Sequence, residues 1–249
     1  MDVGEKLILV HECLCAEYNC PIAYFADLDP LSELISSLLS HRTKNADSAR
    51  AFRALRERFV SWEIVRDAPL SEIQDAIAAC TWPEQKAPRL QAVLQKLTES
   101  HGEPLSLDFL AHMPVIAARA FLEKLPGVGP KTSAATLAFS RIRARALPVD
   151  SHHHRVAARL GILAGNIDVG PAHAQLDALL PAEWDAQTVY DHHEALMLHG
   201  QRVCFFRAPA CGKCVVRDVC DYYSAKYGGG DASGEGSGDG SAPGEVGAA

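Results

Sequence analysis

The sequence predicts an all-α protein. Apolar residues recur at helical spacing along most of the 249-residue chain, and no segment shows the strict apolar–polar alternation of a half-buried strand. Hydrophobic residues make up 48% of the chain, which is enough to bury a core in one large domain or two small ones.

Helices are expected at four apolar-periodic segments in the first half of the chain, and a further helix is expected to begin at a capping box in 71–74. Pro114 can occupy the first turn of the last of these helices. The periodic positions are Leu31, Leu34, Ile35, Leu38 and Leu39; Phe52, Leu55 and Phe59; Leu90, Val93, Leu94 and Leu97; and Ala118, Phe121, Leu122 and Leu125.

In the second half, helices are expected at about 131–142, 151–160, 172–180 and 187–198. Asp150 is placed to cap the helix at 151–160, and Gly161 is placed to end it. The tail, residues 228–249, is rich in Gly, Ser and Asp and has too little apolar surface to bury, so it is expected to be disordered.

The net charge is −7, which by itself argues against nucleic-acid binding. Four acidic residues of the tail leave −7 + 4 = −3 for the remainder, so any DNA surface must be a local basic patch. No apolar run approaches the roughly 18 residues of a membrane helix, and the first residues lack the pattern of a signal peptide. We therefore expect a cytoplasmic protein without a membrane partner.

Four cysteines are spaced C-x6-C-x2-C-x5-C within one short loop: Cys204, Cys211, Cys214 and Cys220. In a cytosolic chain, such a cluster indicates a metal site rather than disulfides. Four thiolates suit either zinc or a cubane iron–sulfur cluster, and one C-x2-C pair flanked by lone cysteines favours iron–sulfur only modestly.

This spacing closely resembles the [4Fe-4S] loop of endonuclease III and of adenine DNA glycosylases. The resemblance implies a [4Fe-4S] cofactor that organises the loop and is not the catalyst. Arg207, Lys213 and Arg217 lie in the same stretch and are expected to contact DNA phosphates, with a solvated surface as the alternative.

The segment 125–132, LPGVGPKT, predicts a hairpin between two helices. Gly127 and Gly129 permit positive φ angles and close backbone approach, and Pro130 can open the second helix. The hairpin amides can then donate to a phosphate without reading sequence, although an ordinary interhelical turn is the alternative. The whole string strongly resembles the helix–hairpin–helix motif of DNA glycosylases, which favours DNA binding.

Lys131 is expected in the first turn of that second helix, where the helix dipole and partial burial favour the neutral amine. A neutral amine can attack a sugar carbon, whereas an exposed lysine would bind phosphate. The family resemblance decides between these roles, because bifunctional members have their nucleophilic lysine at this place in the motif. Monofunctional adenine glycosylases lack it there.

Asp150 lies in the string PVDSH, residues 148–152, and can act both as a helix N-cap and as a carboxylate that stabilises positive charge on a sugar. The string looks like the Val-Asp-Thr/Ser-His segment of the family, whose aspartate is catalytic, and His152 is expected to contact phosphate. The implied reaction everts a damaged nucleotide, such as an oxidised pyrimidine. Lys131 then displaces the base with help from Asp150, and the Schiff base undergoes β-elimination.

Two loops are expected to fill the hole that an everted nucleotide leaves in the duplex. By resemblance, Arg42 stands where the family usually has glutamine, and Trp82 stands at the place of a bulky apolar wedge. A tryptophan can stack on exposed bases at about 1–3 kcal/mol each. The alternatives are a plain phosphate contact for Arg42 and a helix-capping core contact for Trp82.

Adjacent histidines at 152–154 and 192–193 lack an accompanying ligand pattern, so we do not expect them to bind metal. Cys13, Cys15 and Cys20 are expected to be buried thiols rather than a second metal site.

The resemblance covers about residues 20–225 and implies a two-part fold with a DNA cleft between the parts. A six-helix unit at 27–144 contains the helix–hairpin–helix motif, and residues 1–26 join 145–227 in a cluster-bearing unit. We expect a monomer that acts on double-stranded DNA containing a damaged base or an abasic site. Two alternatives stay open: a monofunctional glycosylase, which Lys131 argues against, and a weakly active or inactive DNA-binding paralogue, which the acidic balance and Arg42 favour.

Overall fold

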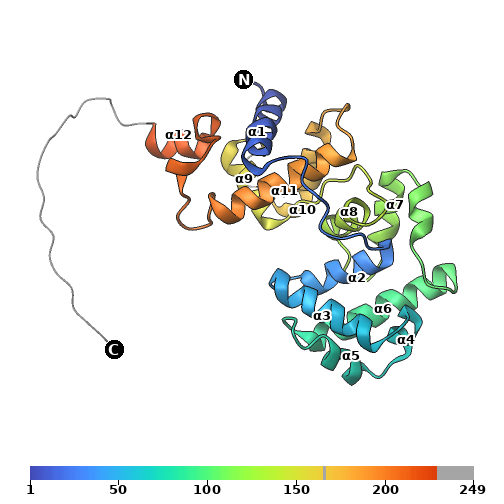
Figure 1. The fold of residues 1–249 in the computed structure, drawn as a ribbon. Coiled ribbons are helices and arrows are strands. Elements are labelled where there is room, and N and C mark those ends of the chain that lie inside the picture. Colours follow the sequence, from blue (N-terminus) through green and yellow to red (C-terminus); the bar gives the residue numbers. More distant parts are fainter. Residues whose placement is uncertain (165–166, 229–249) are drawn as a thin grey trace, which may run out of the picture.

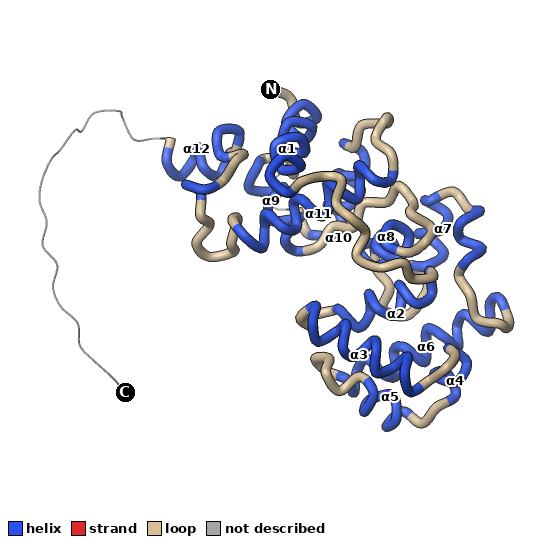
Figure 2. Tube along the Cα trace, viewed as in Figure 1, coloured by secondary structure: helices blue, strands red, loops and turns tan. Residues whose placement is uncertain are grey.

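The computed structural model describes residues 1–164 and 167–228, and all regular elements in these ranges are helices (Figures 1 and 2). None of the described helices is long and apolar enough to cross a membrane. The tail was expected to be disordered, and its residues from 229 onward lie outside the described ranges.

The α-helices are α1 Val3–Tyr18, α2 Pro30–Ser40, α3 Asn45–Arg58, α4 Trp62–Asp67, α5 Leu70–Ala76, α6 Pro83–His101, α7 Val115–Leu122, α8 Pro130–Phe139, α9 Ser151–Leu160, α10 Val169–Leu179, α11 Ala186–Arg202 and α12 Asp221–Tyr227. Short 3-10 turns are η1 Asp108–His112, η2 Cys211–Lys213 and η3 Arg217–Val219.

Each segment with helical periodicity forms a helix, and α9 has the expected bounds. Two details of the predicted helix starts were wrong. No side-chain cap forms at the start of α5, because the helix already begins at Leu70 with Pro69 at the N-cap, so the expected capping box lies inside it. Pro114 is the N-cap of α7 and not part of its first turn.

Helices α2 to α8 enclose one hydrophobic core, whose buried members run from Leu31 to Ala146. It is built almost wholly from aliphatic side chains on facing helices, which is what a 3.6-residue apolar period produces. Helices α2 and α8 pack against each other here, and α8 carries the predicted hairpin lysine.

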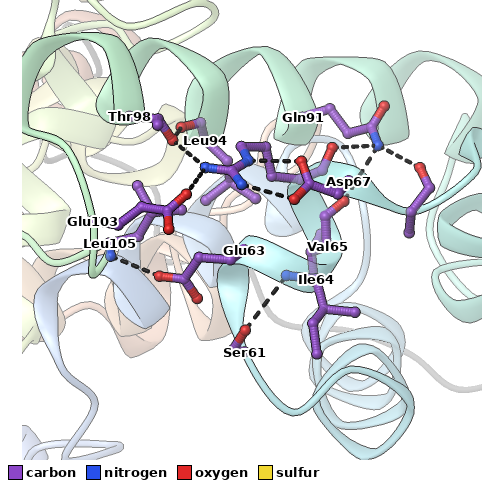
Figure 3. Close-up of polar contacts among 12 residues, drawn as sticks. Ser61, Glu63, Ile64, Val65, Asp67, Gln91, Leu94, Thr98, Glu103 and Leu105 are labelled. Carbon is purple, nitrogen blue, oxygen red and sulfur yellow. Dashed lines mark hydrogen bonds and ion pairs between the residues drawn. The ribbon is translucent and has the colours of Figure 1, made fainter.

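A polar network fastens the outer edge of this first core (Figure 3). The side-chain amide of Gln91 on α6 donates to the carbonyl oxygens of Val65, Arg66 and Ala68, at 3.3, 2.9 and 2.7 Å. These bonds cover carbonyl groups that the end of the short helix α4 leaves without helical partners. The network therefore adds polar contacts to the packing of α4 against α6.

A second core gathers residues from both ends of the described chain, from Leu7, Val10 and Leu14 of α1 to Val216 and Cys220. In Figure 1, α1 lies beside α9 and α11, although some 130 residues or more separate them in sequence. Unlike the first core, it is accompanied by five buried histidines: His153, His173, His192, His193 and His199.

Helices α1, α9 and α12 meet at one corner of the second core. The Lys6 ammonium donates to the Leu160 carbonyl oxygen at 2.8 Å and to Asp221 Oδ1 at 2.6 Å. Gly161 ends α9 in the left-handed conformation, with φ of 78°, and a Cβ atom there would overlap the Asp221 carboxylate. The predicted C-cap is therefore also a point of close approach between α9 and α12.

The prediction of buried thiols at Cys15 and Cys20 was wrong, because these two cysteines form a disulfide across the end of α1. Asn19, in the left-handed conformation with φ of 60°, turns the chain so that the two residues meet. Cys13 is a free, half-buried thiol.

Candidate active site

The loop Leu125–Gly129 turns the chain from α7 into α8, as the glycine motif predicts. Gly127 has a φ of 77°, and a Cβ atom there would come within 2.5 Å of Cδ of Arg89. Gly129 does not use a positive φ: it is the extended N-cap of α8, with φ of −111° and open space where a Cβ would point. Only the first glycine is thus required by the turn itself, whereas the second leaves the amide end of α8 accessible.

Lys131 is the second residue of α8, and Pro130 opens the helix as expected. Neighbouring hydroxyl groups fix this turn. Thr132 Oγ1 lies 3.0 Å from Nε2 of His41, and Ser133 donates to Glu123 Oε1 at 2.6 Å. Burial lowers the pKa of His41 to about 4, so its imidazole is neutral beside the lysine at physiological pH.

Asp150 is the N-cap of α9, and its Oδ1 accepts a hydrogen bond from the His153 amide at 2.7 Å. Two buried histidines hold the backbone of the two residues before Asp150. The Val149 amide donates to Nε2 of His173 at 3.0 Å, and Nδ1 of His193 donates to the Pro148 carbonyl oxygen at 2.7 Å. The backbone before Asp150 and the first turn of α9 after it therefore both fix the position of the carboxylate.

Lys131 and Asp150 line one cavity of about 400 Å³. Its walls come from both cores, because α2 and α3 belong to the first, and Asp150 and α11 flank the second. Volumes of this size are typical of pockets that hold a small ligand or a single group of a large one.

Burial lowers the pKa of Lys131, while the nearby carboxylates Asp150, Glu33 and Glu194 oppose that shift. The neutral amine is thus favoured by desolvation, and its ammonium form keeps three acidic partners. This balance suits an amine that must lose and regain a proton during a reaction.

Two acidic residues of this cavity were missed by the sequence reasoning. Burial raises the pKa of Glu33 on α2 to about 7, and burial together with Asp150 raises the pKa of Glu194 on α11 to about 7. Glu33 stands on the apolar face of a helix, which is a detectable signal, because a carboxylate is seldom buried without a role. Glu194 gave no comparable signal.

The structure brings Arg42 and Trp82 together. The Arg42 guanidinium carbon lies 6.0 Å from the Trp82 ring centroid, and both residues have left-handed backbones, with φ of 51° and 56°. Such conformations cost non-glycine residues about 1–2 kcal/mol each. Trp82 is the N-cap of α6 and is 45% exposed, so the wedge role and the helix-capping alternative both stay open.

Lys86 holds these two loops in place and was not singled out from the sequence. Its buried ammonium donates to the Leu39 carbonyl oxygen and to Thr43 Oγ1, both at 2.6 Å. Thr43 Oγ1 also accepts from the Thr81 amide at 3.2 Å. One side chain of α6 therefore joins the loop after α2 to the loop before α6.

The four clustered cysteines surround one small pocket, which Arg159, Tyr222 and Tyr223 also line. Two nitrogen atoms approach the sulfurs: Nη1 of Arg159 lies 3.2 Å from Cys204 Sγ, and Nε2 of His199 lies 3.4 Å from Cys214 Sγ. Arg159 brings positive charge to Cys204, whereas burial raises the pKa of the Cys214 thiol to about 11 and also raises that of Cys220.

Four thiols that line one pocket are a donor set that suits zinc or a [4Fe-4S] cluster. Across residues 1–164 and 167–228, no three His, Cys, Asp or Glu side chains meet the geometry for holding one metal ion. A [4Fe-4S] cluster takes one thiolate at each of its irons, so it needs sulfurs around a volume rather than at one point. The four cysteines meet that requirement.

Arginines of α9 fasten this cysteine loop to the helix that Asp150 caps. Arg155 donates to the carbonyl oxygens of Gly200 at 2.7 Å and Cys204 at 3.0 Å. Arg159 donates to those of Phe205 and Phe206, both at 2.7 Å. Neither arginine was noted in the sequence.

The remaining predicted DNA contacts lie at the surface. Arg207, Lys213 and Arg217 are exposed on the cysteine loop, and His152 is partly exposed on α9. His152 Nδ1 lies 3.1 Å from Nη2 of Arg155, so it stands beside the arginine that carries the loop. None of the four lines the cavity of Lys131.

Comparisons with known proteins identify the fold and its relatives. The family model of HhH-GPD superfamily base excision DNA repair proteins matches residues 35–182. An endonuclease III of Thermotoga maritima is 30% identical over 79% of this chain and 85% of its own. An endonuclease III of Sulfolobus acidocaldarius is 27% identical over 76% and 81%. A solved trapped covalent intermediate of endonuclease III with DNA superposes with a TM-score of 0.75, at 22% identity, over 91% of this chain and 99% of that one.

These matches confirm the all-α helix–hairpin–helix glycosylase fold and the family that the cysteine loop and the hairpin indicate. The division into two units at the expected boundaries and the roles of individual residues stay predictions.

Proposed function

The chain belongs to the HhH-GPD superfamily of base excision DNA repair proteins and is a DNA glycosylase of the endonuclease III type; we propose that it is bifunctional, releasing damaged bases and then cutting the abasic strand. The observation that carries this proposal is the shared cavity of Lys131 and Asp150, in which burial favours the neutral amine. A monofunctional enzyme, which activates water, needs no such amine.

The proposed reaction follows from these two side chains. The neutral amine of Lys131 attacks the anomeric carbon of an everted nucleotide, and the Asp150 carboxylate stabilises the positive charge that develops on the sugar. Once the base has left and the sugar ring has opened, Lys131 holds the sugar as a Schiff base. Loss of a proton from the neighbouring carbon then expels the 3′ phosphate by β-elimination.

The rest of the proposed site binds DNA. Amides of the hairpin and of the first turn of α8, with Gly129 left open, would hold a phosphate next to the everted nucleotide. Arg42 and Trp82 would occupy the gap in the base stack. Arg207, Lys213, Arg217 and His152 would contact the flanking phosphates. The expected partner is double-stranded DNA with an oxidised pyrimidine or an abasic site, bound by a monomer.

Cys204, Cys211, Cys214 and Cys220 would hold a [4Fe-4S] cluster, which when bound supplies structural order to the loop and no step of the reaction. Arg155 and Arg159 connect that loop to α9, whose N-terminus carries Asp150. We propose that the loop sets the position of the basic residues relative to the cavity.

Borohydride trapping tests this function. Wild-type protein incubated with a duplex carrying one oxidised pyrimidine is expected to give a covalent complex, and Lys131→Ala is expected to give none. Lys124→Ala is the matched control, because this exposed lysine lies outside the cavity. Asp150→Asn keeps a residue that can cap α9, and base release is expected to fall about 100-fold or more as its charge is lost.

Base release without trapping would identify a monofunctional glycosylase instead. Duplex binding with neither base release nor trapping, across a panel of lesions, would identify an inactive DNA-binding paralogue.

A further inference from the structure

Glu33 is a buried carboxyl group that the proposed attack by Lys131 leaves without a task. It lies on α2 and is 8% exposed, and it lines the cavity together with Ser36 and Ser37. The hydroxyl of Ser37, one helical turn later, donates to Glu33 Oε1 at 3.1 Å. This leaves the other carboxyl oxygen free of any recorded hydrogen bond within the described chain.

The surroundings of Glu33 favour its protonated form near neutral pH. Burial raises its pKa to about 7, against the lowering effects of the Ser37 hydroxyl, Lys131 of α8 and Arg143. Asp150, His193 and Glu194 line the same cavity from the side of the second core, and Arg53 lines it from α3. Because Lys131 must be neutral to react, the largest cationic partner of Glu33 is removed when it attacks.

Glu194 is the competing acid in this cavity, but its charge partners differ. The strongest charge acting on Glu194 is Asp150, whereas the strongest acting on Glu33 is Lys131. Glu194 lies on α11, on the side of the cavity from which Asp150 also comes, and Glu33 lies on α2 beside the hydroxyl groups of Ser36 and Ser37.

We propose that Glu33 is a further catalytic residue: the general acid that protonates the departing base. This inference rests on the proposed function. It defines the substrate class as bases that present a ring nitrogen or a carbonyl oxygen to α2, where the carboxyl proton can be delivered.

The bond between the anomeric carbon and the base nitrogen breaks, and its electron pair stays with the base. The Glu33 carboxyl proton moves to the acceptor atom of the base, which leaves as a neutral molecule. The lone pair of Lys131 Nζ forms the new bond to the anomeric carbon, so the resulting cationic nitrogen is matched by the Glu33 carboxylate. That carboxylate or Asp150 can then take the surplus proton from the nitrogen.

A two-substrate assay separates this role from every other role of the cavity. Glu33→Gln is measured on a duplex with an oxidised pyrimidine and on one with a preformed abasic site, which has no base to protonate. General acids contribute typically 10²–10⁴-fold, so base release is expected to fall about 100-fold or more. Cleavage of the abasic duplex and its borohydride trapping are expected to stay within about threefold of wild type.

The pH profile supplies a second readout that needs no loss of folding. In wild type, the rate of base release relative to abasic-strand cleavage is expected to fall above about pH 7, as Glu33 ionises. Ser37→Ala removes the hydroxyl that stabilises the ionised form, so this fall should move to higher pH. Ser100→Ala is the control, since Ser100 lies on α6 outside the cavity and leaves the surroundings of Glu33 unchanged.

Equal losses on both substrates would overturn the proposal, because they would show that Glu33 serves Lys131 or the fold. Unchanged base release in Glu33→Gln, or a ratio without pH dependence in wild type, would overturn it as well. Failure of the proposed function looks different: wild-type protein would then neither cut nor trap the abasic duplex.

Discussion

The two cores of this protein solve the same packing problem with different side chains. The first, from Leu31 to Ala146, is mostly aliphatic, and among the described residues it contains no buried histidine. The second is surrounded by five buried histidines and ends at the cysteine pocket. Aliphatic side chains neither titrate nor bind metal, whereas imidazoles and thiols do both. The fold is therefore expected to be unevenly sensitive to its conditions.

The histidines of the second core illustrate the cost of that choice. Both ring nitrogens of His153 and Nδ1 of His192 are buried without a hydrogen-bond partner within the described residues. In return, His173 and His193 fix the backbone before Asp150. The second core is thus the part of the molecule that positions a predicted catalytic carboxylate, and the first core supplies the opposite wall of the cavity.

The largest expected effect is loss of the cysteine site. Cys214→Ala should abolish iron binding and destabilise the second core by several kcal/mol, because metal-binding free energy contributes directly to folding in such loops. Hydrogen exchange should accelerate in 147–220 and stay slow in 31–97. Cys13→Ala is the matched control, since this free thiol packs on the same core outside the pocket. Equal acceleration in both regions would mean that the cores unfold as one.

Acid should weaken the second core next. Burial lowers the pKa of His192 from 6.5 to about 3. The unfolded chain therefore binds a proton at His192 below about pH 6.5, whereas the folded protein binds it only near pH 3. The stabilisation is complete above pH 6.5 and is lost as the pH falls towards 3. At pH 4.5 His192 alone should cost roughly 3 kcal/mol.

Urea unfolding followed at pH 7 and pH 4.5 measures this difference, and hydrogen exchange assigns it to a core. His112→Ala serves as the control, because this histidine is exposed. Glu33 and Glu194 gain stability over the same pH range because their pKa values are raised to about 7, so the result is judged by region. A loss confined to 31–97 would contradict the contrast between the cores.

The smallest of the three effects concerns the corner where α1, α9 and α12 meet. Gly161→Ala introduces left-handed strain of about 1–2 kcal/mol and displaces Asp221 from Lys6. A double-mutant cycle with Asp221→Ala separates the two parts. In that background, the cost of Gly161→Ala should shrink to the backbone strain alone. Additive costs would show that the close approach of α12 contributes nothing.

Much of the helical framework could be read from periodicity, and the reason is local. Leu31 to Leu39 and Leu90 to Leu97 repeat at helical spacing because one face of each helix is buried. Helices α1, α4 and α12 were not predicted. For α4 and α12 the reason is their length, since six or seven residues are too few to show a period. The interactions that hold α4 were not predicted either, because they come from Gln91 on another helix.

By itself, the sequence determined the helical class, the hairpin before Lys131, the capping role of Asp150 and the grouping of four cysteines. Each of these depends on residues near one another in the chain, whose spacing fixes their geometry. Only the tertiary structure decided that Glu33 and Glu194 join Lys131 in one cavity, that Arg42 meets Trp82, and that Cys15 pairs with Cys20. It also decided the ionisation of Lys131, Glu33 and Glu194, because a pKa depends on burial and on charges contributed by distant helices.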